Sequence, residues 1–260
     1  GPEGYQWYPD HPELTVERPF LYDSTFAHEY QHLIHADYNP GDDTFMNEAC
    51  SMFAEILCYG SYGIAWNHIN SYLYTPDNSL NKWGDQGDIN ILADYGAAQL
   101  WATYLNDNYG EEFIGYFVQN GIVGVGGINA ALEHFGYDKT FDDVYWEWNL
   151  ANYLHSAKRS PYTYKTIDLN PETNPEVIPM NIHDVKIKGK GPHTFYGSDF
   201  GSTMTILGHD TGVVDLAPYS SDYIMFDDWN DDAILYFDGG EASEVPYGWM
   251  MVDGEWYSDG

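Results

Sequence analysis

Up to about residue 160, apolar side chains recur every three or four positions, the spacing of helices that bury one face. Phe45, Ala49 and Phe53 show this spacing in one run. Gly60 follows that run and favours the end of a helix. The pattern predicts helices over residues 44–59, 95–109, 111–120, 127–135 and 141–157.

The pattern changes after residue 160, where short apolar runs are separated by Gly, Asp and Pro, as in antiparallel strands. We predict strands at residues 185–188, 204–207, 223–226 and 234–237. The sequence thus predicts an α+β fold, with a mainly helical domain over residues 1–160 and a β-rich, antiparallel, sandwich-like region over residues 161–260. Residues 253–257 still look strand-like, so we expect this β-rich region to be truncated.

The clearest chemical motif is H-E-x-x-H at residues 28–32, in a stretch that is expected to be helical. His28 and His32 are four positions apart, so they share one helix face at about 6 Å along the axis and can bind one zinc ion. Glu29 is rotated by about 100° from His28, which places its carboxylate beside the metal. There it can polarise a zinc-bound water, and we predict that it acts as the general base.

A catalytic zinc site needs a third protein ligand and one open position for water. His35 lies about 10 Å along the axis from His28, so we expect it to be exposed or to neighbour a ligand, and not to bind the metal itself. Glu48 and Glu55 share one face of the next predicted helix, also about 10 Å apart. Only one of these two carboxylates can reach the metal.

The motif at residues 28–32, followed by Asn47-Glu48-Ala49-Cys50-Ser51, resembles the gluzincin metallopeptidases, whose second motif is N-E-x-x-S or similar. Together with the neighbouring residues 53–55, it is most similar to the hyicolysin-like secreted bacterial peptidases. The resemblance implies a zincin-type catalytic domain with Zn²⁺ held by His28, His32 and Glu48. It also implies a secreted or cell-surface protein.

Two supporting roles also follow from this resemblance. Thermolysin-like members use an aspartate, four residues after the glutamate ligand, to orient a zinc-bound histidine. This chain has Met52 there, and Glu55 is one candidate for the role. Residues 94–98 are similar to the Tyr-x-x-Ala stretch of aminopeptidase-type relatives, which implies that Tyr95 stabilises the developing oxyanion. A tyrosine that only packs against the core, or one of several downstream histidines, is the alternative.

We therefore expect zinc-dependent hydrolysis of peptide bonds in protein or peptide substrates, with Glu29 as general base. Two alternatives stay open. In one, the chain is a catalytically silent, acidic binding or adhesion module with a structural or vestigial metal site. In the other, the zinc is structural and a fourth ligand closes it, supplied by His35, Asp42 or Asp43.

Composition narrows the set of partners. The chain has 9 Lys and Arg residues against 41 Asp and Glu, a formal net charge of −32, which disfavours nucleic acid and anionic membranes. We expect a monomer. Because no run of 18 apolar residues occurs, we also expect no insertion into membranes. The aspartate-rich loops at residues 76–78 and 84–88 are candidates for binding Ca²⁺, with ordinary polar loops as the alternative.

Overall fold

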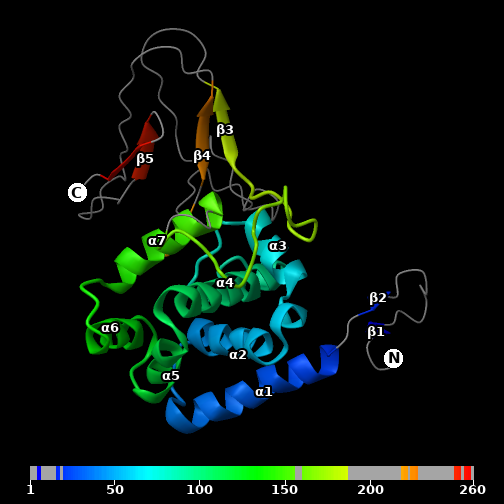
Figure 1. Ribbon diagram of the computed structural model, residues 1–260, viewed down its shortest axis with the longest axis vertical. Coiled ribbons are helices and arrows are strands. Elements are labelled where there is room, and N and C mark those ends of the chain that lie inside the picture. Colours follow the sequence, from blue (N-terminus) through cyan, green and yellow to red (C-terminus); the bar gives the residue numbers. More distant parts are fainter. Residues whose placement is uncertain are drawn as a thin grey trace.

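The computed structural model describes residues 20–155, 160–186, 218–221 and 223–227, together with the backbone of short strands at residues 5–6, 16–17, 249–252 and 255–258. Helices dominate the described residues (Figure 1). They are α1 Leu21–Tyr38, α2 Thr44–Tyr59, α3 Trp66–Tyr74, α4 Ile91–Tyr109, α5 Glu111–Gln119, α6 Gly124–His134 and α7 Phe141–Leu154, with 3-10 turns η2 Gly60–Gly63 and η3 Asp88–Asn90.

The predicted helices correspond to α2, α4, α5, α6 and α7, with ends that differ from the prediction by at most four residues. Helix α3 has no counterpart among them. Helix α7 begins with a capping box, because the Asp143 backbone N–H donates to Thr140 Oγ1 and the Asp143 carboxylate accepts from the Thr140 backbone N–H. Gly110, at φ 93°, ends α4 and starts α5, a backbone conformation that favours glycine.

Helix α4 is the centre of the helical domain. It is buried around most of its circumference, as expected of a core helix and not of an amphipathic surface helix. Helices α2 and α3 pack against it, and α2 lies between α4 and α1 (Figure 1). Trp101 of α4 meets Trp148 of α7 edge to face at a centroid distance of 5.6 Å, and Tyr72 of α3 stacks on the same Trp148. This aromatic cluster joins α3, α4 and α7.

Helix α1 is packed mainly on one side, against α2, and lies at the edge of the domain (Figure 1). Its outer side carries apolar residues that remain in contact with solvent: Phe26 is 69% exposed and Leu33 is 67% exposed. Tyr30, on the same side, stacks with Phe26 at a centroid distance of 6.1 Å. Helix α1 is therefore held in place largely by what it contacts on α2.

A buried pair fixes the turn between α1 and α2. His35 is fully buried, and its Nε2 atom lies 2.8 Å from Asp42 Oδ2. The other oxygen of Asp42 accepts a hydrogen bond from the Gly124 backbone N–H at 2.6 Å, so this turn is tied to the start of α6. The expectation that His35 is exposed or neighbours a metal ligand is wrong, because its ring is used to hold the turn.

The predicted α+β fold is wrong for the described residues, which form a helical domain. Residues 161–182, assigned to the β-rich region by sequence, contain no strand. Their apolar side chains pack one by one onto the helical core, among them Tyr164, Ile167 and Leu169. The irregular spacing of these residues explains why the change of pattern after residue 160 does not start a sheet.

The strands that the structure describes are short and occur in separate pairs. β1 Tyr5–Gln6 pairs with β2 Val16–Glu17, and β5 Trp249–Val252 pairs with β6 Glu255–Ser258, both antiparallel. β3 His183–Lys186 pairs with β4 Ile224–Asp227 in parallel, whereas the sequence suggested antiparallel strands there. The predicted strands at 204–207 and 234–237 lie outside the described residues. None of the described helices combines the length and the apolar character that crossing a bilayer requires.

Helices α3 and α4 approach each other closely at Gly96. A Cβ atom at this position would lie 2.1 Å from the carbonyl oxygen of His68. The absence of a side chain therefore allows the two backbones to come into contact, directly beside Tyr95 on α4.

We expect Gly96→Ala to lower the free energy of unfolding by about 1–3 kcal/mol, because the added methyl group must separate the two backbones. Gly115→Ala is the matched control, since nothing lies within 4 Å of a Cβ atom there, and Gly115 is inside α5. This control should raise stability by about 0.5–1 kcal/mol through helix propensity. Urea denaturation of both variants makes the comparison, and equal effects would contradict the close contact.

Candidate metal centre

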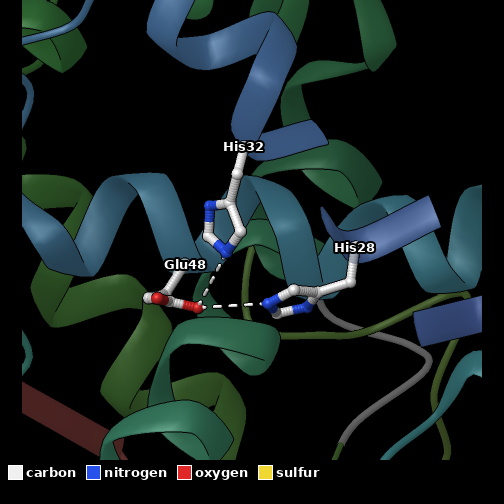
Figure 2. Close-up of side chains that lie close together, drawn as sticks. All are labelled: His28, His32 and Glu48. Atoms are coloured by element: carbon white, nitrogen blue, oxygen red, sulfur yellow. Dashed lines mark ion pairs between the residues drawn. The ribbon is translucent and has the colours of Figure 1, made fainter. Parts of the chain in front are cut away.

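His28 and His32 point from α1 toward α2, where Glu48 meets both rings (Figure 2). Glu48 Oε2 lies 3.3 Å from His28 Nε2 and 3.6 Å from His32 Nε2. Ligands bound to a tetrahedral zinc ion at roughly 2.0–2.1 Å are about 3.4 Å from one another, which matches these separations. The three residues form a group that could hold a metal ion.

Helix α2 also fixes the orientation of both imidazoles through their other ring nitrogen. His28 Nδ1 lies 3.0 Å from Glu55 Oε1. His32 Nδ1 lies 2.8 Å from Asn47 Oδ1 and 3.1 Å from Ser51 Oγ. When Nδ1 carries the proton and donates it to these oxygens, Nε2 presents its lone pair to the metal position, the tautomer that metal-binding histidines adopt.

The structure thus separates the two carboxylates that the sequence left open. Glu48 faces the Nε2 atoms, and Glu55, two turns further along α2, accepts from His28 Nδ1. Sequence reasoning missed the roles of Asn47 and Ser51. The available signal was their helical spacing, because positions 47, 48, 51 and 55 recur on one side of a helix.

The site is partly enclosed. The side chain of His28 is 12% exposed, that of Glu48 is 15% exposed and that of His32 is 26% exposed. Burial lowers the pKa of His28, but the nearby carboxylates of Glu48 and Glu55 outweigh this effect and raise the pKa to about 9. Two carboxylates therefore favour a positive charge at this position, supplied by a proton or by a metal ion.

The Glu48 Oε2 atom favours a bound cation at this site. Glu48 Oε2 is buried and has no hydrogen-bond partner among the described residues, although His28 Nε2 is only 3.3 Å away. A buried carboxylate oxygen without a donor is costly. A metal ion bound to the two Nε2 atoms and to this oxygen would supply the missing interaction, so the donor set fits such an ion.

The two predicted catalytic residues lie on helices α1 and α4. Glu29 follows His28 on α1 and is exposed. Tyr95 lies on α4, half-buried, with its ring against Trp83 at a centroid distance of 4.9 Å. Burial raises the pKa of Tyr95, and the negative charges of Glu48 and Glu29 raise it further. Its phenol thus stays protonated at neutral pH and available as a donor, near the carboxylates of the site.

The alternative of a structural zinc site requires a fourth protein ligand. Among the described residues, His28, His32 and Glu48 are the ones that form a group that could hold a metal ion. His35 and Asp42, two candidates for a fourth ligand, are bound to each other.

No protein-family model matches this chain, and no curated protein matches its sequence. The likeness to gluzincins therefore depends on the two motifs, and the geometry described above is independent of it.

We expect the chain to bind about one zinc ion, and Glu48→Ala to abolish this binding at micromolar metal. Glu55→Ala should weaken it by only about 10–100-fold, because Glu55 holds a ligand and does not coordinate the ion itself. Glu111→Ala, an exposed glutamate in the first turn of α5, is the control and should bind like the parent. Elemental analysis and competition with a zinc chelator measure the series. A larger loss in Glu55→Ala than in Glu48→Ala would exchange the two roles.

Proposed function

We propose that this protein is a zinc metallopeptidase of the gluzincin type, which hydrolyses peptide bonds in protein substrates. The observation that supports this most strongly is the convergence of two Nε2 atoms and one carboxylate oxygen, with Glu29 next to His28 on the same helix. A structural metal site does not require a carboxylate at the helix position next to a histidine ligand, whereas hydrolysis by a metal-activated water requires one as general base.

Zinc is the metal that best suits this donor set. Two imidazoles and one carboxylate are a ligand combination of catalytic zinc sites, whereas calcium and magnesium prefer oxygen ligands alone. His28, His32 and Glu48 would hold the ion. When bound there, zinc lowers the pKa of a coordinated water to about 7 and polarises the carbonyl group of the substrate.

The chain's own residues then move the proton. Glu29 accepts a proton from the attacking water at a carboxylate oxygen and later gives it to the amide nitrogen that leaves. Its exposure fits this role, because the carboxylate must reach both the water and the substrate. Tyr95 keeps its phenolic proton and donates a hydrogen bond to the carbonyl oxygen as that oxygen becomes negative.

The acidic composition bears on the choice of substrate. With a formal net charge of −32, the protein attracts cationic polypeptides and repels acidic ones at low ionic strength. We propose extracellular protein substrates, in line with the resemblance to secreted peptidases. In the alternative of a silent binding module, the same residues would bind metal and the parent protein would show no turnover.

We expect Glu29→Gln to retain zinc and to lose at least 10²-fold in kcat on casein or a peptide library, because an amide cannot accept the proton. Glu133→Gln, an exposed site on α6, is the control and should be fully active. Zinc content is measured on the same samples. Turnover that persists in Glu29→Gln would place the general base elsewhere.

Tyr95→Phe removes one hydrogen-bond donor and leaves the ring in contact with Trp83. If Tyr95 stabilises the oxyanion, kcat should fall by about 10²–10³ with little change in KM. Tyr116→Phe, on α5 and stacked on His134, is the control. An unchanged kcat in Tyr95→Phe would make this tyrosine a packing residue, and the zinc site would lack its proposed donor.

A further inference from the structure

The outer face of α1, on the side away from α2, carries large apolar side chains in contact with solvent. Phe26 is 69% exposed, Tyr30 is 53% exposed and Leu33 is 67% exposed. These residues recur four and three positions apart, so they form one stripe along the helix. Exposed apolar surface of this kind marks interaction sites on soluble proteins.

Glu29, the proposed general base, lies at the edge of this apolar stripe. Helix geometry places Phe26 about 60° and Leu33 about 40° from Glu29 around the axis, both in the same direction. His32 lies about 60° away in the opposite direction. Because Glu29 is exposed, a polypeptide that reaches it and extends away from the two histidines must pass over the stripe.

The charged groups on the same face are carboxylates. Asp23, Glu29 and Asp37 are exposed and are interleaved with the apolar stripe around the helix. The sequence contains no lysine or arginine between Arg18 and Lys82, so neither α1 nor α2 carries a permanent cation that could neutralise these groups. A ligand that complements this face must combine large apolar side chains with positive charge.

The two aromatic rings of the stripe suit the same kind of ligand. Phe26 and Tyr30 stack with their ring planes 14° apart. An exposed aromatic face attracts lysine and arginine side chains as well as apolar groups. The rings therefore accept either component of a segment that alternates apolar and basic residues.

Two other occupants are disfavoured by charge. A second copy of this chain would bring the same carboxylates together, and the formal net charge of −32 adds to the repulsion. An anionic lipid surface is repelled by the same groups. A cationic polypeptide is attracted both by this face and by the protein as a whole.

We propose that the outer face of α1 binds cationic amphipathic polypeptide segments, and that such segments are the substrate class of this protein. This inference rests on the proposed peptidase function and adds to it the element that selects the substrate. Binding along α1 would hold the segment beside Glu29 and the metal centre. The selection would come from α1 itself, through its apolar stripe and its interleaved carboxylates.

Two quenched fluorescent peptides test the inference on the zinc-loaded full chain. Both contain the same central run of Phe and Leu, which is flanked by lysines in one peptide and by glutamines in the other. At low salt we expect kcat/KM to be at least about tenfold higher for the lysine peptide, through several exposed ion pairs. This preference should shrink severalfold at about 0.5 M NaCl, because salt screens exposed charges.

Leu33→Ala should raise KM for the lysine peptide about 5–20-fold with little change in kcat, because it removes apolar contact area and leaves Glu29 in place. Asp37→Asn should reduce the preference for lysine about two- to fivefold, the size expected of one exposed ion pair. Ile178→Ala and Asp138→Asn are the matched controls. Both change exposed residues outside α1 and α2, and both variants should behave like the parent.

Fluorescence anisotropy with a non-hydrolysable version of the lysine peptide separates this inference from the proposed function. Binding that Leu33→Ala weakens, without cleavage of either peptide, would overturn the peptidase assignment and support the binding face. Equal kcat/KM for the two peptides, or an unchanged KM in Leu33→Ala, would overturn the inference and leave the peptidase assignment intact. Self-association, or sedimentation with phosphatidylcholine vesicles, that Leu33→Ala abolishes would instead assign the face to a second copy or to a lipid surface.

Discussion

The contact between α1 and α2 determines what this protein can do. Every side chain that orients the two histidines comes from α2, and that helix is supported from behind by α4. The four residues concerned, Asn47, Glu48, Ser51 and Glu55, lie on one side of α2 and serve two rings on α1. Because they share one rigid helix, their relative positions are fixed before any metal arrives, which is the condition for a well-defined site.

The sequence predicted the part of this arrangement that depends on local geometry. The four-residue spacing of His28 and His32 places both rings on one face of any α-helix, and periodicity located most of the helices. It could not choose between Glu48 and Glu55, because both face the same way. The choice depends on how far α1 is shifted along α2, which is a property of the tertiary structure. The family resemblance, and not helix geometry, indicated Glu48.

The errors have the same origin. His35 has the spacing of a surface residue near the metal, yet a buried aspartate seven residues later holds its ring in the turn. Residues 161–182 were placed in the β-rich region although no individual strand was predicted there, and their apolar side chains pack separately on the helical core. Short apolar runs show that a segment has something to bury, and they do not show against which partner.

The edge position of α1 has a consequence for how the protein would lose its structure. This helix exposes Phe26 and Leu33 on one side and is attached on the other through a contact rich in polar groups. A metal ion shared by His28, His32 and Glu48 would close a loop of chain between the two helices, as a covalent crosslink does. Without the ion, we expect α1 to be the first part of the described chain to detach, while the aromatic core around Trp148 stays intact. Loss of the metal would then expose an apolar, aggregation-prone surface before the domain unfolds.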